Sequence, residues 1–338
     1  MSPPVPLVEV KDLRTYFHTE DGIARAVDGI SFAIAPERTL GVVGESGCGK
    51  SVTARSIMRL VEPQGRIESG EILYEIDGTV IDLARLDLRG RTIHEIRGND
   101  IAMIFQEPMT SLNPVFTIGD QIMEGILLHQ GVGRSEARRR AMAMLEAVAI
   151  PSPHRRIDEH PHQLSGGMRQ RAMIAMALSC NPSLLIADEP TTALDVTIQA
   201  QVVDLMRQLQ REFRTAMMFI THDLGVIADI ADDVIVMYLG QIVEQAPVRE
   251  LFRNPKHPYT QGLMNSLPPL TLPRKRRLSA IEGSVPSPFA VPPGCRFAPR
   301  CPQVMDICRG ASPHLRQVGS EHQAACFLHE PVMTVDAP

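Results

Sequence analysis

The sequence predicts an α/β protein with a mainly parallel sheet. Short buried apolar segments alternate along the chain with segments of helical periodicity, which is typical of a layered domain. A glycine-rich loop lies directly between one apolar segment and a helix. After about residue 251 the chain becomes rich in proline and loses its periodicity. We therefore expect one large domain at 1–250 and a smaller, irregular extension at 251–338.

The first hundred residues are predicted to be mostly strand. Apolar and polar residues alternate in PLVEVKDLRTYF, and TLGVVG is a short buried strand that runs into the glycine loop. The helical spacing of Val52, Ile57 and Leu60 predicts a helix directly after that loop. The expected strands are 6–17, 24–35, 39–44, 70–78 and 100–108, and the expected helix is 51–61.

Helices dominate the middle of the chain. The apolar periodicity predicts a helical subdomain at about 107–182. Strands then return around one long amphipathic helix, which restores the alternation of the layered domain. The expected helices are 117–130, 135–150, 166–180 and 197–213, and the later strands are 183–190, 216–223 and 233–245.

Composition and charge limit the classes of function. A net charge of -5 gives no reason to expect nucleic acid as a partner. The N-terminal residues lack the basic and apolar regions of a signal peptide. No apolar run approaches the roughly 20 residues that span a bilayer. We therefore expect a cytosolic chain whose membrane role would come through a partner.

The stretch GESGCGKSV matches the phosphate-loop pattern G-x-x-x-x-G-K-S. Backbone N–H groups of such a loop, at the start of a helix, hold the dense negative charge of phosphates. Lys50 is expected to reach the β- and γ-phosphates, and the Ser51 hydroxyl to ligate Mg²⁺. The residues expected to contact nucleotide here are Gly44, Glu45, Ser46, Gly47, Cys48, Gly49, Lys50, Ser51 and Val52.

Two carboxylates follow the buried strand LLIAD. Asp188 is expected to bind Mg²⁺ through water at the end of the strand, and Glu189 to act as general base on the attacking water. Alternatively, Glu189 is an acidic cap of the following helix.

The segment from Leu164 supplies a second anion-binding helix N-terminus and resembles the signature motif of ABC ATPases. That motif usually reads L-S-G-G-Q, whereas Met168 stands at the Gln position in this chain. The anion contacts would come from Ser165 and from the backbone of Gly166 and Gly167. The substitution by Met168 is therefore expected to cost little.

Other motifs of the same family occur in the expected order. Gln106 matches the Q-loop, Asp195 the D-loop and His222 the switch histidine. Phe17 or Tyr16 resembles the aromatic residue that stacks on adenine, and the sequence leaves both open. The resemblance covers roughly the first 250 residues. It implies a P-loop ATPase core with a mainly parallel sheet, an antiparallel β subdomain and a helical insert.

The resemblance also implies a mechanism. Two such domains face head to tail, and ATP lies between the phosphate loop of one and the signature motif of the other. Gln106 would contact Mg²⁺ and the attacking water, while His222 would hold the γ-phosphate and orient Glu189. Hydrolysis would open the dimer, and this motion would drive a membrane channel.

Four cysteines crowd into the C-terminal part with the spacing C-x5-C-x6-C-x17-C. They are Cys295, Cys301, Cys308 and Cys326. Structural zinc usually uses closer pairs, so an iron–sulfur cluster is favoured, while zinc and unligated thiols stay open. The segment HPYTQGLMNSLP, from His257, resembles the opening of the C-terminal extension of dipeptide and oligopeptide importer ATPases. In some members of that branch four cysteines hold a [4Fe–4S] cluster.

Cys48 lies inside the phosphate loop, beside a helix N-terminus that could stabilise a thiolate. One hypothesis is that its alkylation blocks ATP binding. The alternative is an inert, small residue.

These patterns together predict the ATP-hydrolysing subunit of a peptide-type importer at the cytoplasmic face of the cell membrane. The resemblance implies two transmembrane permease subunits, a second homologous ATPase and an extracytoplasmic solute-binding protein as partners. Alternative hypotheses are a soluble ABC-type ATPase and an iron–sulfur regulator that only binds ATP. Nickel chelates and other small solutes stay open as alternative cargo.

Overall fold

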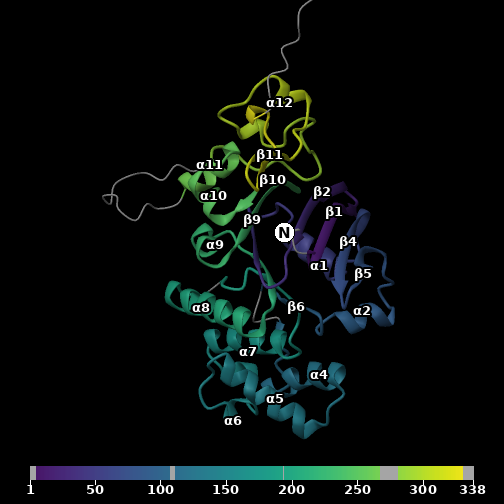
Figure 1. Cartoon of the computed structure of the whole chain (residues 1–338), viewed down its shortest axis with the longest axis vertical. Helices are drawn as coiled ribbons and strands as arrows, with labels where there is room; N and C mark the ends of the chain where they lie inside the picture. The colour runs from purple at the N-terminus through teal and green to yellow at the C-terminus, as the bar shows by residue number, and fades with distance from the viewer. Residues whose placement is uncertain (1–4, 107–110, 193, 267–280, 330–338) are drawn as a thin grey trace, which may run out of the picture.

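The computed structural model describes residues 5–106, 111–192, 194–266 and 281–329, and it has the expected α/β architecture (Figure 1). A small antiparallel sheet and a larger, mainly parallel sheet lie beside each other. A group of helices covers one end of the larger sheet, and the C-terminal extension lies at the other end. Residues 107–110 fall outside the described residues. They include the last two residues of the predicted strand 100–108 and the start of the predicted helical subdomain.

The antiparallel sheet comes from the N-terminal part of the chain, in the order β2-β1-β4-β5. Its strands are β1 (Val8–Thr19), β2 (Gly22–Ile34), β4 (Gly65–Ile76) and β5 (Thr79–Asp82). Val8, Val10, Leu13 and Thr15 of β1 are buried, and the alternation shifts by one residue at the irregularity between Val10 and Leu13. The 3₁₀ turn η1 (Leu83–Arg85) and helix α2 (Arg91–Ile96) lead out of this sheet.

The larger sheet has the order β11-β12-β10-β9-β3-β8-β7-β6. Its parallel strands are β3 (Thr39–Val43), β6 (Ile101–Ile104), β7 (Leu184–Asp188), β8 (Ala216–Ile220) and β9 (Asp233–Tyr238). Every residue of β3, β7 and β8 is buried, which explains why these strands read as continuous apolar runs. The phosphate loop follows the central strand β3, so it lies at the carboxyl edge of this sheet.

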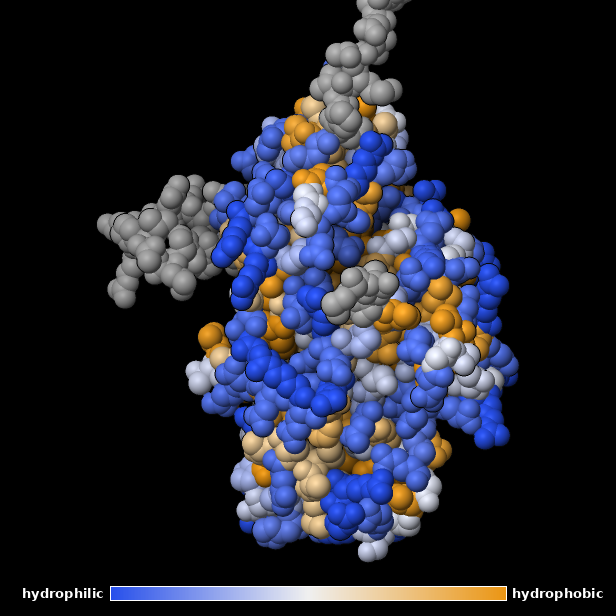
Figure 2. Space-filling model, in the orientation of Figure 1, coloured by the Kyte–Doolittle hydropathy of each residue, from blue (hydrophilic) through white to orange (hydrophobic). Residues whose placement is uncertain are grey.

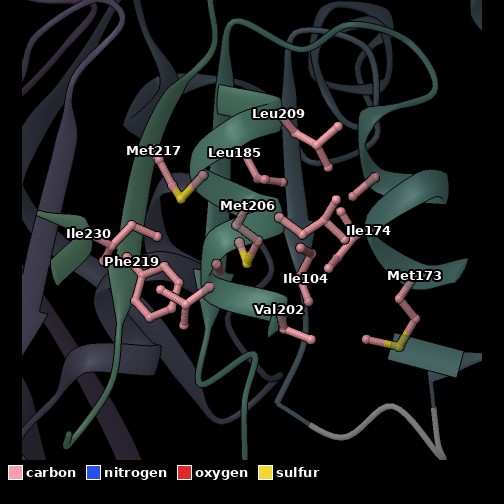
Figure 3. Packing of buried hydrophobic residues seen from close by; sticks show 14 of the residues in the cluster. Ile104, Met173, Ile174, Leu185, Val202, Met206, Leu209, Met217, Phe219 and Ile230 are labelled. Carbon is pink, nitrogen blue, oxygen red and sulfur yellow. The ribbon is translucent and has the colours of Figure 1, made fainter. Parts of the chain in front are cut away.

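Helices pack against the sheet, and those between residues 118 and 178 lie in the range where the sequence predicts a helical subdomain. The helical elements in this group are α1 (Lys50–Ile57), α4 (Ile118–Gln130), α5 (Arg134–Ala147), α6 (Pro153–Arg156), the 3₁₀ turn η2 (Pro161–Gln163), α7 (Gly166–Leu178), α8 (Val196–Phe213) and α9 (Leu224–Ile230). Figure 3 shows Ile174 of α7 and Leu209 of α8 packed near Leu185 of β7. One core therefore joins the helical subdomain to the sheet.

The C-terminal extension shares its core with the large domain. It contains α10 (Val248–Arg253), α11 (Pro258–Asn265), η3 (Ala298–Arg300), α12 (Ile307–Gly310), β11 (Arg316–Gly319), β12 (His322–Ala324) and η4 (Phe327–His329). Strand β12 pairs with β10 (Gln241–Pro247), so the extension lengthens the central sheet. Tyr259 and Phe297 are buried in the common core. This sharing explains why the segment shows so little hydrophobic periodicity of its own.

Several local features differ from the sequence-based expectation. The single strand expected at 233–245 is the hairpin β9–β10, because Leu239 and Gly240 both adopt positive φ in a two-residue turn. Helix α1 ends at Ile57 instead of Val61, and Arg59 is left-handed. The helices α2 and α9, which are only six and seven residues long, were not predicted.

The surface in Figure 2 is mostly hydrophilic and carries only small hydrophobic areas. Within the described part of the chain, no helix is both long enough and apolar enough to cross a bilayer.

Candidate active site

The phosphate loop has a backbone that only glycine tolerates at two positions. Gly44 and Gly49 have φ of 152° and 102°. A Cβ at Gly44 would lie 2.2 Å from the carbonyl oxygen of Met237, and one at Gly49 would lie 2.2 Å from that of Ala26. The loop is therefore held against β9 and β2, with its N–H groups at the start of α1.

Lys50 and Ser51 begin helix α1 and point into the same site. The Lys50 ammonium donates to the carbonyl oxygens of Gly44 (2.8 Å) and Glu45 (3.1 Å), and the residue is only 5% exposed. The Ser51 hydroxyl donates to Asp188 across 2.9 Å. The Lys50 ammonium group is thus held in place by the backbone of the phosphate loop.

The hydroxyl of Ser51 and the carboxylate of Asp188 form a suitable donor pair for Mg²⁺. This ion prefers oxygen ligands and is usually held by one or two protein groups together with substrate phosphates. Asp188 is 1% exposed, and burial raises the pKa of its carboxyl group although the Ser51 hydrogen bond opposes the shift. A bound cation would stabilise the charged form of this buried carboxylate.

The structure brings Glu189, Gln106 and His222 together at the end of β7. The Glu189 carboxylate accepts hydrogen bonds from Gln106 Nε2 (3.2 Å) and Thr192 Oγ1 (2.9 Å). The Nδ1 atom of His222 lies 3.4 Å from Oε1 of Glu189. Glu189 has a left-handed backbone, with φ 46°, which is costly for a residue with a side chain. This conformation turns Glu189 away from the direction of buried Asp188.

The signature turn lies at the start of α7 and is exposed. Ser165 caps the helix, since its hydroxyl accepts from the N–H of Met168 at 3.4 Å. Ser165 and Gly166 are exposed to solvent. A Cβ at Gly167 would meet Ile198 of α8, the helix that Asp195 caps. The signature turn and Asp195 are therefore neighbours on one surface.

The two candidate aromatic residues point in different directions. The hydroxyl of Tyr16 donates to Asp28 at 2.5 Å, which ties the ring into a charged network. A Cβ at Gly65 would lie 2.7 Å from the Phe17 ring and 2.6 Å from Val61, which follows α1. Phe17 is thus on the side of the helix that follows the phosphate loop.

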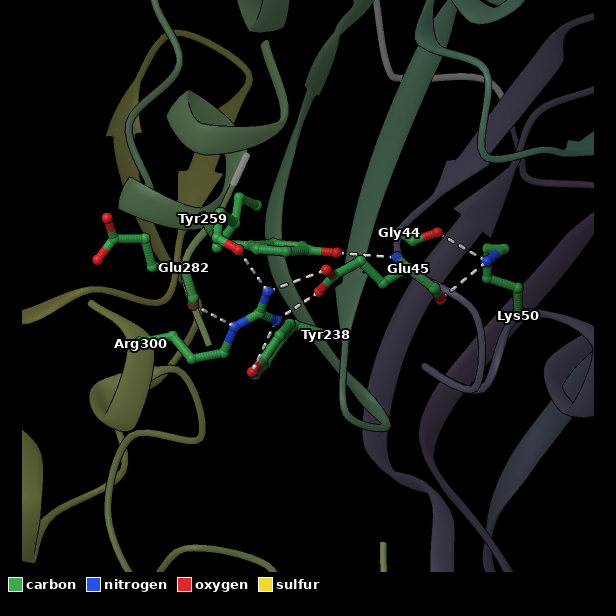
Figure 4. Close-up of polar contacts among 8 residues, drawn as sticks. Gly44, Glu45, Lys50, Tyr238, Tyr259, Glu282 and Arg300 are labelled. Atoms are coloured by element: carbon green, nitrogen blue, oxygen red, sulfur yellow. Dashed lines mark hydrogen bonds and ion pairs between the residues drawn. The ribbon is translucent and has the colours of Figure 1, made fainter. Parts of the chain in front are cut away.

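The C-terminal extension reaches the phosphate loop, a contact that the sequence analysis missed. Figure 4 shows Tyr259 and Arg300 beside Glu45. Tyr259 accepts from the N–H of Glu45, and Arg300 pairs with its carboxylate. An acidic residue inside an anion-binding loop could have signalled the need for a cationic partner.

The structure opposes the expectation of a reactive Cys48. Its thiol is buried at 1% exposure, and burial raises its pKa although the nearby Lys50 ammonium opposes the shift. The helix N-terminus therefore does not produce an accessible thiolate here, because the thiol points into the protein.

The structure does not support the predicted iron–sulfur cluster. The cysteines of the extension lie near one another. The Cys295 N–H donates to the carbonyl oxygen of Cys308. Burial, together with the nearby thiols of Cys295, Cys301 and Cys308, raises the pKa of Cys326 to about 11. However, among the described residues no three His, Cys, Asp or Glu side chains form a group that could hold a metal ion. Cys295 and Cys301 pack against the hydrophobic core, and burial raises the pKa of both thiols, which opposes thiolate formation.

Comparison with protein families matches two parts of the chain. Residues 27–192 match the family described as ABC transporter. Residues 243–308 match the family described as oligopeptide/dipeptide transporter, C-terminal region. The second match begins in β10 and includes most of the extension that contacts the phosphate loop.

Individual relatives match over nearly the whole chain. The oligopeptide transport ATP-binding protein AppD of Bacillus subtilis is 53% identical, over 96% of this chain and 97% of its own length. The dipeptide transport ATP-binding protein DppD of Haemophilus influenzae is 47% identical, over 93% of each chain. A dimeric ATP-binding cassette in a post-hydrolysis state, bound to ADP and Pi, superposes with a TM-score of 0.62. It is 27% identical and covers 72% of this chain and 99% of that one.

Proposed function

The chain belongs to the ABC transporter family, and from this membership we propose that it hydrolyses ATP to power the import of peptides. The observation that carries the proposal is the conjunction of two features in one polypeptide. A phosphate loop meets the group Gln106, Glu189 and His222 at one edge of the sheet. The same chain continues into the oligopeptide/dipeptide type of C-terminal region.

The phosphate loop would bind the β- and γ-phosphates of ATP. Lys50 supplies positive charge, and the N–H groups of Gly47 and Gly49 supply hydrogen-bond donors at a helix N-terminus. Ser51 and Asp188 would hold Mg²⁺, which neutralises charge on the phosphates when it is bound. Phe17 is our candidate for stacking on adenine, because Tyr16 is engaged by Asp28.

Glu189 would accept the proton of the attacking water. Its carboxylate is oriented by Thr192 and Gln106, and His222 lies close enough to position it or to contact the γ-phosphate. A base that is oriented before the reaction loses little entropy when the reaction begins.

Dimerisation would complete the site. Subunits of this family form dimers and work with membrane permease subunits, and the exposed turn Ser165–Gly167 is suited to contact a nucleotide on a partner. Asp195 lies on the same surface and would contact that partner. ATP held by both subunits would favour the closed dimer, and hydrolysis would remove this preference.

The remaining partners follow from the importer hypothesis. We propose two permease subunits, a second homologous ATPase and an extracytoplasmic solute-binding protein, with this chain attached to the cytoplasmic face of the membrane. Phe105, Val115 and Phe116 flank the Gln106 region in sequence and expose 42%, 71% and 52% of their surface. Such exposed apolar residues favour a protein contact, and we assign them to the permease.

Replacing Glu189 by Gln tests the catalytic assignment. We expect hydrolysis by the assembled transporter to fall by about 10³-fold or more, because the base is lost, while ATP-driven dimerisation persists. Phosphate release and size-exclusion chromatography with ATP measure the two effects. Hydrolysis within tenfold of the wild-type rate would overturn the role of Glu189.

The alternatives are weaker. No specific observation favours a soluble ATPase or an iron–sulfur regulator, whereas relatives named for peptide transport match almost the whole chain. An iron and acid-labile sulfide assay on anaerobically purified protein tests the four-cysteine site independently of the ATPase.

A further inference from the structure

Glu45 places a negative charge where the protein should bind a polyanion. It follows Gly44 directly, inside the phosphate loop. A free carboxylate at this position would repel the phosphates of a nucleotide, and partial burial would strengthen that repulsion. The residue has an exposed fraction of 30%. The charge must therefore be compensated within the protein.

Arg300 supplies this compensation from the extension. Its guanidinium donates to both carboxylate oxygens of Glu45, at 2.6 and 3.0 Å (Figure 4). The Arg300 side chain is only 4% exposed, so water screens the pair poorly. Two parallel charge-assisted hydrogen bonds also fix the direction of the Glu45 side chain, which a single ammonium would not do.

Arg300 itself is held in place by several groups. Its Nε donates to the carbonyl oxygen of Glu282 at 3.1 Å, and the guanidinium lies 5.9 Å from the ring of Tyr238. These contacts leave the guanidinium little freedom to turn away from the loop. The Arg300–Glu45 ion pair therefore links the extension to the phosphate loop in a fixed geometry.

A second contact holds the backbone of the same residue. The Tyr259 hydroxyl oxygen accepts from the N–H of Glu45 at 2.8 Å. Tyr259 packs against Tyr238 and Phe297 with ring centroids 4.7 and 5.4 Å away, and all three residues are buried. Helix α11, strand β9 and the segment before η3 therefore meet behind the phosphate loop.

The connection is not an isolated ion pair. Arg296, four residues before Arg300, pairs with Asp28 of β2 and donates to the carbonyl oxygen of Leu239. Asp28 also accepts from Tyr16. Residues 296–300 of the extension therefore form ion pairs with two acidic residues of the large domain, Asp28 and Glu45.

We propose that Arg300 is a positioning residue that neutralises and orients Glu45, so that the C-terminal extension sets the affinity of the phosphate loop for nucleotide. The inference rests on the proposed function, because it takes the loop to be the ATP site. A purely architectural ion pair would stabilise the fold without changing nucleotide affinity. A double substitution of Arg300 and Glu45 separates these two roles.

The test measures equilibrium binding of ADP and of a non-hydrolysable ATP analogue to the full-length protein. Arg300→Gln should weaken binding by about tenfold, because it leaves the Glu45 carboxylate unpaired beside the phosphates. Adding Glu45→Gln should restore binding to within about threefold of wild type, because the double variant removes the repelling charge. Arg309→Gln, at an exposed position of the same extension, is the matched control and should bind within twofold of wild type.

Two results would overturn the proposal: binding by Arg300→Gln within twofold of wild type, or a double variant that binds as weakly as Arg300→Gln alone. Tyr259→Phe covers the case in which Arg300→Gln does not fold. It keeps the ring and removes only the acceptor of the Glu45 N–H, so we expect about threefold weaker binding. Unchanged binding by this variant would count against the proposal.

Lys50→Ala separates this inference from the proposed function. It should abolish nucleotide binding if the loop is the ATP site. If Lys50→Ala abolishes binding and Arg300→Gln does not weaken it, only the inference about the extension fails. If Lys50→Ala binds normally, the proposed site itself is wrong.

Discussion

The phosphate loop and the signature turn are both glycine-containing N-termini of helices, yet they differ in burial and in the contacts around them. The phosphate loop is enclosed: Lys50 is 5% exposed, and the loop contacts β2, β9 and the extension. The signature turn at Ser165 is exposed, and the hydrogen bond from the Met168 N–H to the Ser165 hydroxyl is a local helix cap. The first turn is therefore enclosed by its own chain, whereas Ser165 and Gly166 of the second turn are open to solvent.

Under the proposed function, this difference would allow one polypeptide to carry two anion-binding turns and yet bind a single nucleotide by itself. Backbone N–H groups alone attract anions weakly, and a tight site needs fixed charge and exclusion of water. Only the phosphate loop has Lys50, Asp188 and Ser51 around it. The signature turn is suited to add contacts to a nucleotide that another subunit already holds.

The largest expected effect comes from blocking the exposed turn. Ser165→Arg should lower hydrolysis by the assembled transporter at least about a hundredfold, because the side chain would obstruct the contact with a partner's nucleotide. Binding of ADP to the isolated chain should stay within about twofold. Titration with ADP and phosphate release measure both quantities. Weakened binding by the isolated chain would show that Ser165 belongs to the same site as Lys50, and the comparison would fail.

A second test compares one glycine from each turn. Gly49→Ala should lower the free energy of unfolding by about 2 kcal/mol, because φ is positive and the new methyl group would approach the Ala26 carbonyl oxygen. Gly166→Ala has no atom within 4 Å of its Cβ and should change stability by less than about 0.5 kcal/mol. Urea unfolding compares the two variants. Equal destabilisation would show that the signature turn is as constrained as the loop.

The smallest expected effect is on the pH dependence of stability, and it comes from His257, which lies beside Tyr259 behind the phosphate loop. Burial lowers the pKa of His257 to about 3, and its Nδ1 accepts from the N–H of Tyr259. Because the unfolded chain binds a proton near pH 6.5 and the folded chain does not, stability should fall as pH drops below that value. We expect this group to account for a loss of about 1 kcal/mol between pH 7 and pH 5.5.

His257→Asn checks the assignment, since Asn also caps a helix but does not titrate. Urea unfolding at the two pH values should show a smaller loss for the variant than for the wild type. A pH dependence that is identical in both proteins would contradict the buried, neutral state of His257.

Much of the fold could be predicted from local pattern. The strands β3, β7 and β8 are continuous apolar runs, and α8 has a clear apolar face, so periodicity was sufficient to predict them. Short elements were missed because a helix such as α9 has fewer than two full turns in which to display a period. The sequence pattern predicts one strand in place of the hairpin β9–β10, because its turn, Leu239–Gly240, carries an apolar residue.

The candidate site also combines features that local sequence predicts with features that depend on tertiary contacts. The sequence alone predicted the phosphate loop and the carboxylate pair, because the function proposed for them depends on neighbouring residues and on local backbone geometry. Only the tertiary structure decided that Gln106 and His222 meet Glu189, that Cys48 points inward and that Arg300 reaches Glu45. These contacts join positions 33 to 255 residues apart along the chain. No local pattern encodes them, because side chains meet at such separations only after the sheet and the extension have packed together.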